Sequence, residues 1–155
     1  MTRPYLTLRQ DDGTAPDGAG YFWLQAPAAS AERTERWSAA PPVEAIARST
    51  VVHAVRRCAD RLLAANFWAA GTTRALPSDG PASVLVRPEG KTVVVSLSDP
   101  TQSRSSVVLD LAWRGLRVLS ADPGIRVAPN RSGTRISADT AGRPGEPLTL
   151  TLKWS

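Results

Sequence analysis

His53 is the one histidine of the chain, and it is the first residue to consider for general acid-base catalysis or metal binding. Both chemistries need partner groups nearby. The nearest acids in the sequence, Glu44 and Asp60, do not stand at the three- or four-residue spacing that would place them beside His53 on a helix. A Ser-His-Asp triad is formally possible, but the chain has no Gly-x-Ser-x-Gly elbow. We therefore expect a surface histidine, or one that is satisfied locally, and no catalytic site residue.

The cysteine and the acidic residues likewise form no catalytic or metal-binding motif. The single cysteine, Cys58, excludes an internal disulfide or an all-cysteine metal site, and we expect it to be a small core or half-buried residue. Asp11, Asp12 and Gly13, followed by Asp17, resemble a fragment of a calcium loop, but the bidentate Glu and the regular ligand spacing are missing. A solvated Asx-type turn is favoured. Glycine-rich phosphate-binding motifs are also missing, so the sequence predicts no cofactor and no metal.

Tryptophan is the residue type that could bind a ligand, because an aromatic face packs well on the C–H groups of a sugar ring. Three tryptophans end predicted apolar strand faces and are expected in the core, whereas one lies between charged neighbours and is expected to be the most exposed. The first three are Trp68, Trp113 and Trp154, and the exposed one is Trp37; the fifth is Trp23.

Length and charge limit the class of protein. The chain has 155 residues, with 19 Lys and Arg against 14 Asp and Glu, which gives a net charge of +5. The basic residues are scattered, and Arg56 and Arg57 form the only adjacent pair, so neither a nucleic-acid-binding stripe nor a polybasic membrane patch is expected. The first residues contain no apolar signal region, and no apolar run reaches the roughly 18 residues of a membrane span. These features predict a soluble protein made without an export signal.

The second half of the chain alternates apolar and polar residues. Val93, Val95 and Leu97 fall on one face, and Asp99-Pro100 then ends the strand. Further short strands follow at a spacing of roughly ten residues, which indicates an antiparallel β-sandwich. The predicted strands are Ser83–Arg87, Thr92–Ser98, Ser106–Trp113, Leu116–Ser120, Ile125–Ala128, Thr134–Ala138 and Leu148–Trp154, with turns at Pro88–Lys91 and Asp122–Gly124.

The first half is less uniform. Tyr5–Arg9 is a short alternating run, and the aromatic stretch Tyr21–Gln25 is a strand candidate. Ser30 can cap a short helix that runs through Trp37 and is ended by Pro41-Pro42.

The segment Val43–Trp68 supports two interpretations. Its apolar spacing and alanine content favour a helix of about 15 residues. Three shorter strands compete with that helix, because β-branched and aromatic residues are spaced along the segment. They are Val43–Ala47, Val51–Arg56 and Leu62–Trp68. The polar connector Gly71–Pro81 that follows is the best internal boundary.

Five ordered stretches carry a resemblance to a known family. They are Asp12–Pro16 with Gly20–Pro27, which resemble an Asp-His-Gly-x-x-Pro loop and the Tyr-x-Tyr strand after it, then Pro42–Ile46, Ala64–Trp68, Gly80–Arg87 and Val94–Gln102. Together they resemble the C-terminal β-region of family 8 polysaccharide lyases, the group of hyaluronate, chondroitin AC and xanthan lyases. Asp11-Asp12 stands where the family loop has Asp-His. The resemblance extends from about Tyr5 to Trp154. It implies that the segment Val43–Trp68 forms strands rather than a helix.

The resemblance implies an all-β fold with one short helix. Residues 1–76 would be the tail of a larger β-supersandwich, and residues 77–155 would be the C-terminal β-sandwich domain. Family members are secreted enzymes several times longer, and their catalytic Asn, His, Tyr and Arg lie in an α/α toroid that has no counterpart here. No catalytic residue is therefore carried over to this chain.

Three functional hypotheses are consistent with the sequence. The first is a truncated, non-catalytic β-region of a lyase, which supports a toroid or holds an acidic polysaccharide such as hyaluronan, chondroitin or xanthan. The second is a stand-alone carbohydrate-binding β-sandwich, in which exposed tryptophan and arginine recognise anionic sugars. The third is an unrelated intracellular β-protein, suggested by the missing signal peptide. No nucleic-acid or membrane partner is expected under any of them.

Overall fold

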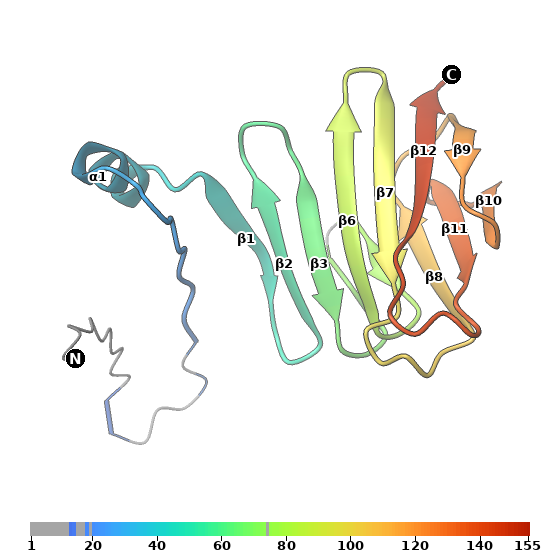
Figure 1. Ribbon diagram of the computed structural model, residues 1–155, viewed down its shortest axis with the longest axis horizontal. Coiled ribbons are helices and arrows are strands. Elements are labelled where there is room, and N and C mark those ends of the chain that lie inside the picture. The colour runs from blue at the N-terminus through green and yellow to red at the C-terminus, as the bar shows by residue number, and fades with distance from the viewer. Residues whose placement is uncertain (1–12, 15–17, 19, 74) are drawn as a thin grey trace, which may run out of the picture.

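Two antiparallel sheets build the protein (Figure 1). The computed structural model describes residues 13–14, 18, 20–73 and 75–155. The expected all-β sandwich with one short helix is confirmed. The run Tyr5–Arg9 and the acidic residues Asp11, Asp12 and Asp17 lie outside the described residues, so the predictions made for them stay predictions.

The larger sheet has seven strands and the smaller sheet has five. In spatial order the larger sheet contains β1 (Val43–Arg48), β2 (Val52–Arg57), β3 (Leu63–Phe67), β6 (Ala82–Glu89), β7 (Thr92–Ser98), β12 (Leu148–Trp154) and β9 (Leu116–Ala121). The smaller sheet contains β10 (Ile125–Pro129), β11 (Thr134–Asp139), β8 (Ser106–Leu111), β5 (Pro77–Ser78) and β4 (Gly71–Thr72). In Figure 1, β8, β10 and β11 lie behind one half of the larger sheet, and β1 stands at its far edge.

The core lies between the sheets, and the period-two pattern of the sequence builds it. Every second residue of β7 and of β12 is buried, as the alternation predicts, except that Trp154 at the end of β12 is partly buried. The facing strands β8 and β11 contribute in the same way. Central members with 1% exposure or less are Val93, Val95, Leu97, Leu148, Leu150 and Leu152 from the larger sheet, and Val107, Leu109, Ile136 and Ala138 from the smaller one.

The N-terminal part of the described chain leaves the sandwich. Helix α1 (Ala31–Ala39) forms as predicted, with the Ser30 hydroxyl accepting a hydrogen bond from the Arg33 N–H at 3.2 Å. It lies beyond β1 and has no buried residue (Figure 1). The strand predicted for Tyr21–Gln25 is wrong: this stretch has no regular structure, and Trp23 is 62% exposed. Within the described residues, no helix has the length and apolar character needed to span a bilayer.

The helical interpretation of Val43–Trp68 is also wrong. The segment forms β1, β2 and β3, as the family resemblance implies. Strand β3 pairs with β6, so β1, β2 and β3 continue the larger sheet. Pairing of the backbone and burial of Val52, Ala65 and Phe67 outweigh the local helix preference of the alanines.

The polar connector Gly71–Pro81 is more ordered than its composition suggests. It holds the short strands β4 and β5, and Leu76 is fully buried. Strands on both sides of the predicted boundary between residues 76 and 77 share the larger sheet. The division into two domains at that point stays a prediction.

Asp99 fixes the crossing from β7 in one sheet to β8 in the other. Its carboxylate is 1% exposed and accepts hydrogen bonds from the N–H groups of Thr101 (2.9 Å), Ser103 (2.8 Å) and Arg104 (2.7 Å) and from the Thr101 hydroxyl (2.6 Å). Burial by itself would raise the pKa of Asp99. The hydrogen bonds from Thr101, Arg104 and Ser103 outweigh burial and lower the pKa to about 2.

Arg104 then ties this loop to the start of β6. Its guanidinium donates to the Pro81 carbonyl at 3.0 Å and forms an ion pair with Asp79 at 2.8 Å. Gly80 lies between these two partners, and a Cβ there would stand 2.6 Å from the Arg104 guanidinium. The Thr140 hydroxyl donates to the Arg104 carbonyl at 2.7 Å. The loop after β7 is therefore held to both neighbouring connections.

Replacement of Asp99 by Asn should lower the free energy of unfolding by about 2 kcal/mol at pH 7, because the ionised carboxylate is favoured in the folded state. A carboxyl whose folded pKa is depressed stabilises above its unfolded pKa of about 4, and the stabilisation is lost as the pH falls toward about 2. In urea unfolding, the difference in free energy of unfolding between wild type and D99N should thus become smaller as the pH falls from about 4 to about 2. The control is D139N, at an exposed carboxylate that accepts a hydrogen bond from the Ala141 N–H. If the free energies of unfolding of wild type and D99N differed equally at pH 7 and at pH 2, the assigned role of the Asp99 carboxylate would be wrong.

Candidate functional site

His53 lies exposed on the outer face of β2 and has no acidic partner among the described residues. Glu44 forms an ion pair with Arg56, and Asp60 forms one with Arg57, so arginines engage both acids. The ring of His53 instead meets the edge of Trp68, with centroids 6.0 Å apart. Across the described part of the chain, no group of three or more His, Cys, Asp or Glu residues could hold a metal ion. A surface histidine was expected, and this part of the prediction is confirmed.

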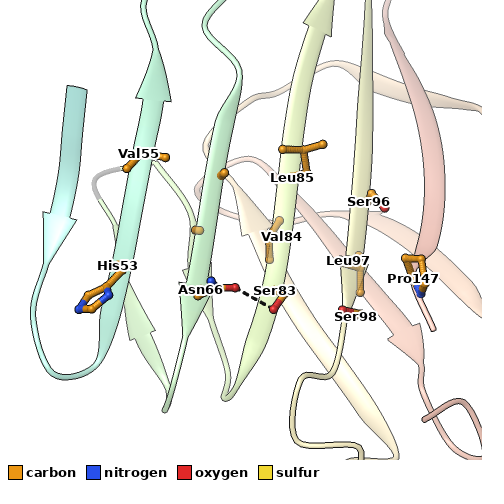
Figure 2. Close-up of a pocket in the computed structure, with 12 residues that line it drawn as sticks. His53, Val55, Asn66, Ser83, Val84, Leu85, Ser96, Leu97, Ser98 and Pro147 are labelled. Carbon is orange, nitrogen blue, oxygen red and sulfur yellow. Dashed lines mark hydrogen bonds between the residues drawn. The ribbon is translucent and has the colours of Figure 1, made fainter. Parts of the chain in front are cut away.

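A shallow groove crosses the outer face of the larger sheet; we call it the sheet-face groove (Figure 2). Cross-strand pairing aligns His53 with Asn66, Asn66 with Ser83, and Ser83 with Ser98. One row of polar side chains therefore spans four strands. The Ser83 hydroxyl donates to Asn66 Oδ1 at 2.8 Å. Other side chains that line the groove are Val55, Ala64, Leu85, Ser96 and Pro147, and its volume is about 390 Å³.

A second groove, the tryptophan groove, opens on the inner side of the larger sheet and has a volume of about 510 Å³. Trp113 and Trp154 line one wall, with ring centroids 5.8 Å apart and planes inclined by 52°. Arg56 and Arg61 also line it. The remaining lining residues are Glu44, Ala45, Ile46, Leu63, Thr73, Ala75 and Pro88. Aromatic faces and guanidinium groups thus meet in one concave site.

The turn between β2 and β3 positions Arg61. Asp60 accepts a 2.8 Å hydrogen bond from Arg57 Nε and a longer one, at 3.4 Å, from the Leu62 N–H. The hydrogen bond from Arg57 is the main cause that lowers the pKa of Asp60 to about 2, so this carboxylate stays ionised at neutral pH. Arg61 itself has a left-handed backbone (φ 58°) and an exposed side chain. No ion pair of Arg61 is found among the described residues.

Burial confirms some of the expectations for single residues and corrects others. Trp113 and Trp154 pack against the core as predicted, although each keeps part of its ring open. Trp68 is 51% exposed, so its predicted core position is wrong: Phe67 takes the inward position and Trp68 points to the other face. Trp37 was expected to be the most exposed tryptophan, and this is wrong: it is partly buried, with Arg33 lying over its ring, and Trp23 and Trp68 are more exposed. Cys58, expected to be buried or half-buried, is exposed.

Residues 44–108 match the family described as polysaccharide lyase family 8, C-terminal beta-sandwich domain. The chain carries a family 8 polysaccharide lyase C-terminal β-region. The lineage that the sequence resemblance implied is thereby confirmed.

Curated relatives of this β-region are much longer proteins. A xanthan lyase from Bacillus sp. (strain GL1) is 31% identical over 94% of the chain and 16% of the relative. A hyaluronate lyase from Thermasporomyces composti is 33% identical over 90% of the chain and 18% of the relative. The chain thus spans less than a fifth of the length of these relatives.

Solved structures agree with this assignment. The β-region superposes on a chondroitin AC lyase variant from Streptomyces coelicolor A3 with a TM-score of 0.76 and 26% identity, over 82% of this chain and 17% of that one. A Paenibacillus xanthan lyase gives a TM-score of 0.77 at 20% identity, over 82% of this chain and 12% of that one, which shows the shared fold.

The exposure of the tryptophans can be measured by acrylamide quenching of their fluorescence. Trp68→Phe should remove a large part of the readily quenched emission of the β-region, because the Trp68 ring is half exposed. Trp113→Phe should remove emission that is quenched more slowly, since that ring packs against the core. Trp23→Phe is the matched control for an exposed ring. If Trp68→Phe and Trp113→Phe changed the quenching profile equally, the placement of the two rings would be wrong.

Proposed function

We propose that this β-region is a non-catalytic part of a family 8 lyase and that it holds acidic polysaccharide in the tryptophan groove. The observation that carries the proposal is the meeting of Trp113 and Trp154 with Arg56 and Arg61 in one open groove. Among the relatives, the solved Streptomyces coelicolor chondroitin AC lyase was captured in complex with chondroitin sulphate. That complex makes an acidic sugar chain the natural ligand class to test here.

The groove offers two kinds of contact to an acidic sugar chain. Indole faces pack on the C–H groups of a sugar ring, and guanidinium forks bind carboxylate or sulfate with two parallel hydrogen bonds. Arg56 shares its guanidinium with Glu44, whereas the exposed Arg61 can turn its whole fork to a ligand. Arg61 is therefore the residue that we assign to carboxylate recognition, and the two indoles provide the stacking surface.

The same geometry supports a holding role rather than elimination. Elimination across a uronic acid requires a base that abstracts the C5 proton while the 4-linked sugar departs. Glu44 is the one acid among the described residues that line the tryptophan groove, and Arg56 engages it. His53 lies on the outer face of the sheet, in the other groove. We expect turnover to need the catalytic toroid that the family resemblance implies.

A scaffold role is the second candidate, and exposed apolar surface favours it. Tyr21, Phe22, Trp23 and Leu24 are 45–62% exposed in a stretch without regular structure. Contiguous apolar surface of this kind is typical of a contact with another protein surface. Strand β1 is also the outermost strand of the larger sheet among the described residues, so its edge could pair with a further strand. Both features would suit a β-region that supports a toroid. The third hypothesis, an unrelated β-protein, is not proposed further because the chain carries a family 8 β-region.

Arg61→Asn should weaken binding of hyaluronan oligosaccharides about tenfold, because one charge-assisted contact is lost. Asn suits the left-handed backbone at this position, so the fold should be retained. Arg126→Asn, at an exposed arginine of β10, is the matched control. Affinity electrophoresis gives the measurement, and added salt should weaken the wild-type interaction. Equal binding by the two variants would contradict the assignment of Arg61.

The same samples test the non-catalytic part of the proposal. Wild-type β-region mixed with hyaluronan, chondroitin sulfate or xanthan should give no rise in the ultraviolet absorbance of the C4=C5 double bond. A robust rise from this chain alone would overturn that part, whatever the affinity results are.

A further inference from the structure

We propose that the sheet-face groove is a second binding site, and that its ligand is a neutral saccharide chain such as a β-linked glucan. This site is independent of the tryptophan groove, since the two lie on opposite faces of the larger sheet. Its defining feature is the aligned row of His53, Asn66, Ser83 and Ser98 (Figure 2).

The row suits an extended ligand. Neighbouring strands stand about 4.8 Å apart, so four aligned side chains cover about 14 Å across the sheet. They lie at one level on the rigid strands β2, β3, β6 and β7, and the paired backbone fixes their spacing. A chain laid across the strands would meet a polar side chain at each of them.

The row can also donate and accept hydrogen bonds. Ser83 orients Asn66 by donating to Oδ1, which leaves the Asn66 side-chain N–H₂ group directed away from this bond. The His53 ring nitrogens and the Ser98 hydroxyl have no hydrogen-bond partner among the described residues. Sugar hydroxyl groups both donate and accept, so this mixed set of amide, imidazole and hydroxyl groups matches them.

Charge separates this site from the tryptophan groove. Its lining residues include no Arg, Lys, Asp or Glu, and His53 is the one titratable group. Arg48 of β1 pairs with His53 at the end of the row but lies outside the lining, so the groove itself offers an anionic ligand no guanidinium to offset its desolvation. The chemistry therefore favours an uncharged, hydroxyl-rich chain.

Apolar surface completes the platform. Trp68 is 51% exposed and meets the His53 ring at the end of the polar row. The next row, in which Val55 aligns with Ala64 and Ala64 with Leu85, gives a flat apolar strip beside the polar one. A sugar ring has hydroxyl edges and C–H faces, and the two adjacent rows offer a contact for each. The groove volume of about 390 Å³ falls within the usual range of small-molecule sites.

Titration of the chain with cello-oligosaccharides, followed by calorimetry, tests the proposal. Wild type should bind, and the affinity should not change between low and high salt because the ligand is neutral. Trp68→Ala and Asn66→Ala should each weaken binding about fivefold to tenfold. Trp23→Ala is the control for Trp68, since both rings are exposed in wild type. Circular dichroism of each variant shows whether the fold is kept.

Several outcomes would overturn the proposal. They are no heat of binding with wild type, equal losses in Trp68→Ala and Trp23→Ala, or self-association through this face in sedimentation experiments. Arg61→Asn separates the two sites: it should leave cello-oligosaccharide binding unchanged while weakening hyaluronan binding. If Arg61→Asn bound neither ligand, the proposal of an independent neutral site would be wrong. If the wild type bound cello-oligosaccharides but not hyaluronan, only the proposal for the tryptophan groove would be wrong.

Discussion

The buried carboxylate of Asp99 is the interaction on which the sandwich depends most. The chain must leave β7 in one sheet and enter β8 in the other within seven residues, and three backbone N–H groups of that crossing converge on Asp99. Arg104 extends the constraint to the start of β6, because its guanidinium reaches Asp79 and the Pro81 carbonyl. The two sheets are thereby fixed face to face, and their apolar sides form one core. Trp113 and Trp154 of the tryptophan groove pack against this core.

The larger sheet reaches beyond the smaller one, and this difference in width opens the tryptophan groove. On the inner side, β1, β2 and β3 pass the edge of the second layer, where Trp113 and Trp154 close the core and Arg56 and Arg61 line the open part. On the outer side the sheet-face groove is open, and the alternate residues of its strands form rows of polar and apolar character. Under our two proposals, one face takes anionic sugars and the other takes neutral ones. A β-region with two such faces could keep a polysaccharide close to a lyase without taking part in the chemistry.

Sequence reasoning predicted the second half of the fold well and the sites poorly. Alternation at Val93, Val95 and Leu97 decides which residues are buried, and Asp99-Pro100 marks the end of the strand. The same reasoning favoured a helix over Val43–Trp68, because pairing with β6 lies outside any local window. The polar row from His53 to Ser98 depends on the register of four strands, which a single sequence does not determine. Arg61 and Trp113 are far apart along the chain, so no motif could have joined them. A period-two reading of β3 could have placed Phe67 inside and Trp68 outside.

The central claim is that acidic sugar binds at Trp113 and Trp154 and at no other tryptophan. The indole N–H groups of the five tryptophans provide separate signals in a proton–nitrogen correlation spectrum, and single Trp→Phe variants assign them. During titration of the wild-type chain with a hyaluronan oligosaccharide, we expect the signals of Trp113 and Trp154 to shift together along one saturating curve, while those of Trp23, Trp37 and Trp68 stay in place. Shifts confined to Trp23 or Trp68, or no shift at any indole at saturating ligand, would contradict the account.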